Sequence, residues 1–275
     1  MRKTLNLVFS VTLMTSFSIA IIHAQEEPAA NDDVRTLVSR LELEQFKTTL
    51  KGLTAFGDRR QGTKRNRDAV DWIEQQLQSV GCTTTERIDY VYDPPPREGG
   101  GGRRQRPSVA EMNQSDGTPT GGRIGRNGSG PGGSSIFGYR GRTGVTNDPM
   151  AQPDERLREL NSEPATNGPR QEVYCTKIGT THPDEMYILG AHMDGHGWGE
   201  AANDDGSGTA LVMELARIFN APDVEVERSI RFALWNNEET GLNGARAYVE
   251  QRQDLQGQEN PPGSGRFPEP RWLGM

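Results

Sequence analysis

Apolar residues recur at helical spacing in two stretches near the start of the chain. From about residue 33 to residue 56 they lie three or four positions apart, and between Val70 and Val80 the intervals are three, four and three. Gly81 then stands where helices commonly end. The pattern predicts helical structure over both stretches, with a polar loop at residues 57–63 between them.

Strand-like and helix-like patterns alternate through the rest of the chain, apart from one long segment. Short runs that alternate in polarity or are apolar throughout predict strands, and longer runs with apolar residues three or four apart predict helices. The predicted strands are 83–92, 172–179, 185–191 and 227–235, and the predicted helices are 207–219 and 240–249. Such alternation is typical of a sheet covered by helices on both faces. We therefore predict an α/β fold with a mixed, largely parallel sheet.

Residues 93–170 interrupt this pattern. Runs such as Pro94–Pro96 and Gly99–Gly102 cannot bury enough apolar surface to offset the chain entropy that ordering removes. We interpret 93–170 as a Pro/Gly/Arg-rich low-complexity insert. Because the insert is so polar, the hydrophobic fraction of the whole chain is only 32%. The insert separates an N-terminal part, 25–92, from a core, 171–275.

The first part of this insert is rich in arginine. Residues 97–142 hold eight arginines and few acidic residues, so their net charge is positive. A segment that binds polyanions and a solvated linker are both consistent with this composition.

The N-terminal residues have the pattern of a secretory signal peptide. Arg2 and Lys3 precede an apolar run from about Leu5 to Ile22, and Ala24 offers a small residue for cleavage. We predict that residues 1–24 are removed and that the protein is secreted or periplasmic, with no stable membrane span. A membrane anchor is the alternative, because the run approaches a spanning length.

The net charge argues against one class of partner, and the cysteine content fits an oxidising compartment. The net charge of −7 becomes more negative by two when Arg2 and Lys3 are removed, which gives no electrostatic case for nucleic-acid binding. The two cysteines, Cys82 and Cys175, do not have the spacing of a metal site. In an oxidising compartment they form either a disulfide or two separate buried thiols.

Three polar clusters lie at the ends of predicted strands or at the start of a predicted helix. They are 192–194, 203–208 and 236–241. Open α/β sheets bind ligands at the carboxyl ends of their strands, so we expect the clusters to converge. Zinc binds imidazole nitrogen and carboxylate oxygen, which makes His192, Asp204 and Glu239 candidate metal ligands.

The neighbouring acidic residues have candidate roles too. The two oxygens of Asp204 suit a bridge between two zinc ions about 3.5–4 Å apart. Glu238, beside a ligand, is a candidate general base. Asp194 shares a strand face with His192 and is placed to orient its imidazole. Each residue also has a purely structural interpretation: Asp204 as part of a helix-capping turn, His192 as a satisfied surface or core group, and the glutamate pair as a response to the helix dipole.

The three motifs together are specific. Residues 190–194, 202–208 and 238–245 resemble the co-catalytic zinc aminopeptidases, the family that includes bacterial leucyl aminopeptidases, aminopeptidase Y and glutamate carboxypeptidase. The resemblance implies the zinc exopeptidase (phosphorylase/hydrolase-like) fold and two zinc ions. It also implies a cis peptide bond between Asp204 and Asp205. The implied roles are first zinc ligand for His192, bridge for Asp204, second zinc ligand for Glu239, general base for Glu238 and imidazole support for Asp194.

The sequence departs from this family in one respect. The resemblance calls for a further aspartate well after the glutamate pair and a more distant histidine, but only Asp254 follows Glu239 and no histidine follows His196. We therefore expect a chain that is truncated at its C-terminus, with weak metal binding and no turnover of its own.

The function indicated by these motifs is hydrolysis of a peptide or protein substrate. We predict an exported zinc-dependent aminopeptidase that cleaves N-terminal peptide bonds with Glu238 as general base. A carboxypeptidase, a glutaminyl cyclase relative with one zinc and a non-catalytic binding descendant of the fold are alternatives. We expect His182 on the surface, whereas His196, Trp198 and Gly199 are placed to line the rim of the substrate cleft.

Overall fold

The computed structural model describes residues 32–94, 139–140, 145–146, 153–196 and 199–275. The chain divides into two compact units, Met1–Ser39 and Arg40–Met275. The described part of the first unit is helix α1 (Asp32–Ser39). The predicted signal peptide, 1–24, and most of the predicted insert lie outside the described residues. Among the residues described, no helix is long and apolar enough to cross a membrane.

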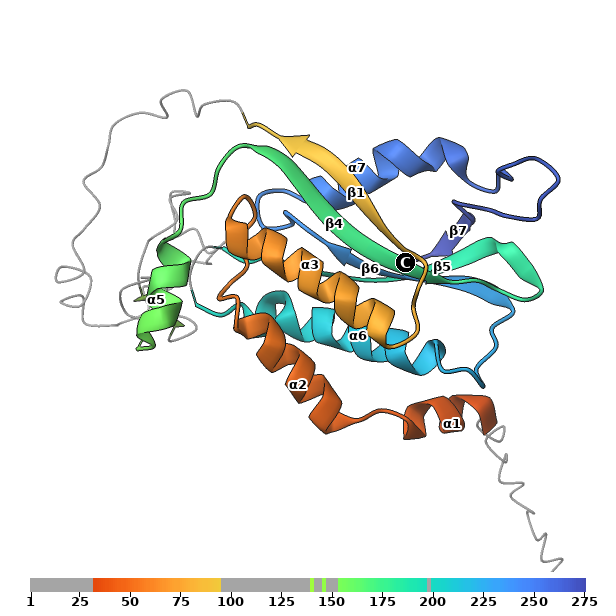
Figure 1. The fold of residues 1–275 in the computed structure, drawn as a ribbon, viewed down its shortest axis with the longest axis horizontal. Coiled ribbons are helices and arrows are strands. Elements are labelled where there is room, and N and C mark those ends of the chain that lie inside the picture. The colour runs from red at the N-terminus through yellow and green to blue at the C-terminus, as the bar shows by residue number, and fades with distance from the viewer. Residues whose placement is uncertain (1–31, 95–138, 141–144, 147–152, 197–198) are drawn as a thin grey trace, which may run out of the picture. The chain divides into compact units, whose positions relative to one another are not determined.

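The second unit contains a five-stranded mixed sheet (Figure 1). Neighbouring strands β1, β4 and β6 run antiparallel to one another, whereas β6, β5 and β7 are parallel. In spatial order the strands are β1 (Thr85–Tyr92), β4 (Gly168–Lys177), β6 (Arg228–Trp235), β5 (His182–His192) and β7 (Arg271–Gly274). The predicted α/β fold with a mixed sheet is confirmed.

Helices cover both faces of this sheet (Figure 1). On one face α2 (Leu43–Thr54), α3 (Lys64–Ser79) and α6 (Ser207–Phe219) pack on a core that includes Leu53, Ile73, Met193 and Phe232. On the other face α7 (Asn243–Arg252) contributes Tyr248 to a second core with Tyr174, Ile188 and Trp235. A short 3-10 helix, Gln253–Leu255, follows α7.

The helices near the start of the chain differ from the prediction at their ends. The stretch expected to be helical over 33–56 is interrupted between α1 and α2, because Glu42 is extended and its backbone N–H donates to Glu214 Oε1 at 2.9 Å. Helix α3 begins well before Val70. Thr63 caps it, and the Thr63 side chain accepts from the backbone N–H of Asn66 at 3.2 Å.

Part of the range predicted as a low-complexity insert is regular structure. Helix α5 (Glu155–Ser162) and the first residues of β4 lie within 93–170, as do two paired two-residue strands, β2 (Tyr139–Arg140) and β3 (Val145–Thr146). Asp154 caps α5, and Leu157 is buried. The sequence pattern missed α5 because one buried leucine in eight residues gives no readable periodicity.

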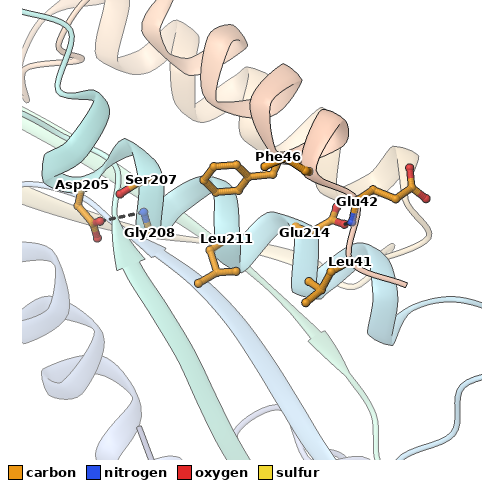
Figure 2. A pocket seen from close by; sticks show the side chains of 9 residues that line it. Leu41, Glu42, Phe46, Asp205, Ser207, Gly208, Leu211 and Glu214 are labelled. Carbon is orange, nitrogen blue, oxygen red and sulfur yellow. Dashed lines mark hydrogen bonds between the residues drawn. The ribbon is translucent and has the colours of Figure 1, made fainter. Parts of the chain in front are cut away.

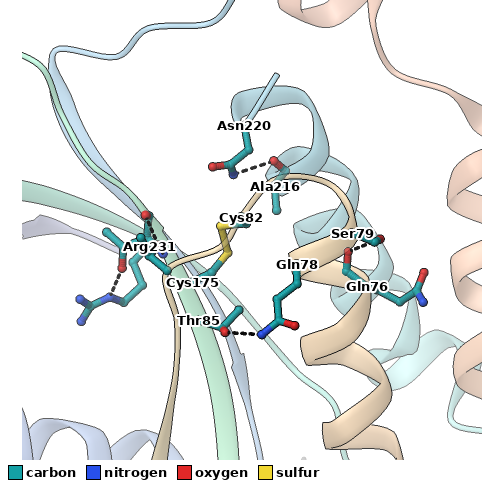
Figure 3. The surroundings of a disulfide bond; sticks show 11 residues. Gln76, Gln78, Ser79, Cys82, Thr85, Cys175, Ala216, Asn220 and Arg231 are labelled. Atoms are coloured by element: carbon teal, nitrogen blue, oxygen red, sulfur yellow. Dashed lines mark hydrogen bonds between the residues drawn. A yellow bond between two sulfur atoms is a disulfide. The ribbon is translucent and has the colours of Figure 1, made fainter. Parts of the chain in front are cut away.

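The two cysteines form a disulfide (Figure 3). Cys82, just after α3, is joined to Cys175 on β4 with an S–S distance of 2.08 Å and a Cα–Cα distance of 6.0 Å. Both residues are buried in the core under α3. The sequence left open whether the cysteines form a disulfide or two separate buried thiols, and the structure shows the disulfide.

Candidate metal centre

The parallel pairing of β5 and β6 brings two of the polar clusters together. His192, the last residue of β5, lies opposite Trp235, the last residue of β6, so both strands end at the same edge of the sheet. Glu238 and Glu239 follow β6 after a short turn. His192, Glu238 and Glu239 each offer one ligand atom, and these three atoms lie within 4.8 Å of one another.

The turn before α6 adds Asp204 to this group. His192 Nε2 lies 3.1 Å from Asp204 Oδ1, and the Asp204 side chain is otherwise largely exposed. The peptide bond between Asp204 and Asp205 is cis, as the family resemblance led us to expect. Asp205 accepts hydrogen bonds from the backbone N–H groups of His192, at 3.3 Å, and Gly208, at 2.9 Å.

Asp194 lies behind these residues and is fully buried. Its carboxylate accepts a hydrogen bond from the backbone N–H of Glu238 at 3.0 Å and another from that of Glu239 at 3.4 Å. The same carboxylate is 3.7 Å from His192 Nδ1, whereas the backbone carbonyl of Asp194 is closer to that nitrogen, at 3.1 Å. The main chain and side chain of Asp194 therefore both face the imidazole, and the side chain also holds the glutamate pair.

The charges in this cluster shift the pKa values of two of its members. Burial lowers the pKa of His192, but the hydrogen bond and charge of Asp194, with the charges of Glu238 and Asp205, outweigh it and raise the pKa to about 9. Burial raises the pKa of Glu238; the charge of His192 opposes this and that of Glu239 reinforces it. Glu238 is thus a stronger base than an exposed glutamate.

Glu239 has one oxygen with a partner and one without. Its Oε2 lies 2.7 Å from His196 Nε2, and its buried Oε1 has no hydrogen-bond partner. A buried carboxylate oxygen without a partner is costly, by about 1–3 kcal/mol or more, unless a cation or a donor reaches it. Imidazole and carboxylate donors around such an oxygen fit a zinc ion.

The other histidines and the cleft-rim residues are placed as follows. His182 is exposed, as expected. His196 contacts the centre through Glu239. The sequence had suggested for His196 only a position on the rim of a cleft. Gly199 accepts a hydrogen bond from Asn161 of α5 at 2.6 Å, so α5 contacts the loop between β5 and Asp204. The rim position expected for Trp198 lies outside the described residues.

A buried polar layer supports the turn that carries the glutamate pair. The side-chain amides of Asn66 and Asn236 exchange two hydrogen bonds, at 3.0 and 2.9 Å, and the Tyr90 hydroxyl donates to the Asn236 carbonyl at 3.1 Å. Glu172 Oε2 accepts from the backbone N–H of Asn236 at 3.2 Å, and burial raises the pKa of Glu172 to about 8. None of these residues was predicted from the sequence to support the centre. For Glu172 the available signal was an acidic residue within a predicted strand.

A groove of about 570 Å³ lies between α2 and α6 (Figure 2). Phe46 from α2 and Leu211 from α6 form apolar parts of its walls, and Asp205 lies at one end. The Asp205 carboxylate there bonds to the first turn of α6 through the N–H of Gly208. The groove thus starts next to the candidate metal centre.

The part of the chain that carries this centre resembles known peptidases. Residues 173–260 match Peptidase family M28. The chain is 41% identical over 105 residues to Aminopeptidase YwaD of Bacillus subtilis, covering 38% of this chain and 22% of the relative. It is 32% identical over 89 residues to Carboxypeptidase Q of Xenopus laevis, covering 31% of this chain and 19% of the relative. The match thus spans about a fifth of the length of each curated relative.

A solved structure supports the fold over a longer range. The crystal structure of a Peptidase M28 precursor from Shewanella amazonensis SB2B superimposes with a TM-score of 0.52 at 19% identity, covering 82% of this chain and 72% of that one. The family match contains His192, Asp194, Asp204, Glu238 and Glu239. Residues 173–260, which carry the candidate metal centre, are therefore similar in sequence to Peptidase family M28.

Proposed function

We propose that this protein is an exported, zinc-dependent exopeptidase that hydrolyses N-terminal peptide bonds. The observation that carries the proposal is the convergence of His192, Asp204, Glu238 and Glu239 at one edge of the sheet. The match to Peptidase family M28 and the 41% sequence identity over 105 residues to Aminopeptidase YwaD support a peptidase activity. The activity of the whole protein, its substrates and its export are part of this proposal.

The residues present fit a zinc site by their chemistry. His192, Asp204 and Glu239 would hold the zinc, and Asp204 would be the ligand shared between two ions, because these residues combine an imidazole with carboxylates and include the unpartnered Glu239 Oε1. Zinc bound there would supply a Lewis acid that polarises the scissile carbonyl and makes water more acidic. The protein's own side chains perform the remaining work.

Glu238 is the proposed general base. Its Oε2 is 3.8 Å from His192 Nε2, so it lies at the centre while its backbone is held by Asp194. The raised pKa of Glu238 favours proton uptake from the attacking water. The protonated carboxyl then donates this proton to the leaving amine, which restores the carboxylate for the next cycle.

Asp194 orients both halves of the centre. By facing His192 Nδ1 it favours the tautomer in which Nε2 is free to bind a metal. By accepting the backbone N–H groups of Glu238 and Glu239 it fixes the turn that carries the base and one ligand. Its role in the proposed reaction is to position these groups.

A carboxypeptidase is the second candidate, because one of the similar proteins is Carboxypeptidase Q. The residues at the centre suit hydrolysis at either end of a peptide, since they act on the scissile bond. The two activities differ in whether a free amine or a free carboxylate of the substrate is bound.

Export is supported by two features of the chain. The pattern of residues 1–24 is that of a signal peptide. The disulfide between Cys82 and Cys175 is typical of proteins from oxidising compartments.

The test of the proposed function measures zinc uptake and peptide hydrolysis together. Equilibrium dialysis against Zn²⁺ and assays with leucine p-nitroanilide are made on this chain and on the product of any longer reading frame that contains it. We expect zinc uptake that is lost in His192→Ala. In a product that turns over, we expect hydrolysis of the free-amine substrate but not of its N-acetylated form. Hydrolysis of N-acetylated dipeptides instead would favour the carboxypeptidase, and no zinc uptake by either product would contradict the proposal.

A further inference from the structure

The side chain of Arg59 is fully buried in the loop between α2 and α3, at a residue with a positive φ of 55°. Its guanidinium donates to five backbone carbonyls. The acceptors are Met193 at 2.7 Å, Ala201 at 2.9 Å, Gly57 at 2.9 Å, Glu200 at 3.0 Å and Leu53 at 3.2 Å. One planar side chain thus connects the end of α2 with two segments that are far from it in sequence.

The two distant segments are those that carry the candidate ligands. Met193 lies between His192 and Asp194, and Ala201 directly precedes the turn that contains Asp204. An added Cβ at Gly206, which ends this turn, would lie 3.2 Å from Arg59 Nη2. The guanidinium therefore packs closely against the turn as well as bonding to the residue before it.

Carboxylates near the centre also act on the charge of Arg59. Burial lowers the pKa of Arg59 to about 10, and the charges of Asp58, Asp194 and Asp205 oppose this shift. A buried cation is costly unless nearby anions and acceptors compensate it. Two of the compensating anions, Asp194 and Asp205, themselves bond to the backbone of Glu238 and His192.

We propose that Arg59 is a positioning residue for the metal centre, which fixes the separation of His192 and Asp204 by holding the main chain beside each of them. The inference rests on the proposed function, because the role of Arg59 presupposes that His192 and Asp204 are metal ligands. An arginine is suited to the task, since its rigid fork of N–H groups reaches both segments at once, whereas lysine has a single nitrogen.

Arg231 provides a matched control on the opposite face of the sheet. It is also buried, and its guanidinium donates to Glu269 at 2.6 Å, to the Tyr248 hydroxyl at 2.6 Å, to the Thr176 hydroxyl at 3.0 Å and to the Pro268 carbonyl at 3.2 Å. None of these partners adjoins a proposed ligand. A change at Arg231 therefore reports the cost of losing a buried arginine without disturbing the proposed metal centre.

The experiment compares Arg59→Lys with Arg231→Lys in the full chain, using Co²⁺ alone as the probe. Hydrogen exchange of the backbone amides in 192–206 and the visible absorption of bound Co²⁺ are measured for each variant. We expect Arg59→Lys to speed exchange in 192–206 more than in β6, and to weaken Co²⁺ binding about 10–100-fold with an altered spectrum. Arg231→Lys should lower stability and leave both readouts for the centre unchanged.

The outcomes separate this inference from the proposed function. If Arg59→Lys retains the wild-type spectrum, Co²⁺ affinity and exchange in 192–206, the inference is overturned and the function stands. If the wild-type chain takes up no Co²⁺, the proposed function fails, and the exchange measurement alone decides the role of Arg59. Arg59→Met, which removes the charge as well, should reproduce the faster exchange, and normal exchange in this variant would also overturn the inference.

Discussion

The Oδ1 atom of Asp194 lies 3.0 Å from the backbone nitrogen of Glu238, so a carboxylate that follows β5 holds the turn that follows β6. Since the chain between the two residues passes through α6, this bond joins segments that are adjacent only in the folded sheet. The proposed base and the proposed ligand His192 are therefore coupled through one buried side chain.

Asp194→Asn should weaken the metal centre without removing a ligand. The amide keeps one oxygen to accept a hydrogen bond, but its NH₂ group faces a backbone N–H where Asp194 Oδ2 accepts from Glu239. We expect zinc affinity to fall about 10–100-fold and a destabilisation of about 1–3 kcal/mol. Zinc titration and urea unfolding measure the two effects. Asp89→Asn, an exposed change on β1, is the control, and equal zinc affinity in both variants would contradict the role of Asp194.

Glu238→Gln should separate catalysis from metal binding. The glutamine occupies the same space but takes up no proton, so in the active protein we expect kcat to fall about 10²–10⁴-fold while zinc content stays unchanged. Glu239→Gln is the matched neighbour, and it should lower zinc content because it removes a proposed ligand charge. The assay is hydrolysis of leucine p-nitroanilide beside metal analysis of each variant. Full activity in Glu238→Gln would rule out its assignment as the base.

Much of the architecture follows from local sequence patterns. The helix predicted at 207–219 is observed as Ser207–Phe219, because its apolar residues repeat at helical spacing over more than three turns. The predicted strands before His192 and the glutamate pair are observed as β5 and β6. Since these strands are parallel neighbours, their carboxyl ends lie together, which is why motif positions sufficed to predict a convergence of polar clusters.

The supporting residues could not be predicted because their partners are remote in sequence. Arg59 bonds to Met193, and Asn66 bonds to Asn236. No periodicity over a window of ten or twenty residues contains such pairs. The break before α2 was missed for the same reason, because the backbone N–H of Glu42 donates to Glu214, which is remote in sequence. The choice between a disulfide and free thiols likewise depended on spatial proximity that the strand predictions did not supply.

Glu172 should make the stability of the fold depend on pH. Burial raises the pKa of Glu172 to about 8 in the folded state, from an ordinary value of 4.5. The folded chain therefore binds one more proton than the unfolded chain between these values, and stability falls as the pH rises from about 5 to about 8, by up to about 1.4 kcal/mol per pH unit.

Glu172→Gln tests this dependence directly. The amide oxygen can still accept from the N–H of Asn236, and the variant has no proton to lose. We expect the variant to gain stability over the wild type progressively between pH 5 and pH 8, as measured by urea unfolding at several pH values. Glu225→Gln, an exposed change, should shift stability equally at every pH. A constant difference between Glu172→Gln and the wild type would show that Glu172 ionises normally.

Loss of the disulfide between Cys82 and Cys175 should be the largest single stability change in the core. The bond closes a loop with a sequence separation of 93 residues, and in the chain-entropy account such a loop contributes about 4–5 kcal/mol by restricting the unfolded state. We expect the double variant Cys82→Ala, Cys175→Ala to unfold at much lower urea concentration than the wild type. A reductant should shift the wild type toward the variant and leave the variant unchanged. If reductant has no effect on the wild type, the two cysteines are not bonded in solution, and the proposed export loses one of its two supports.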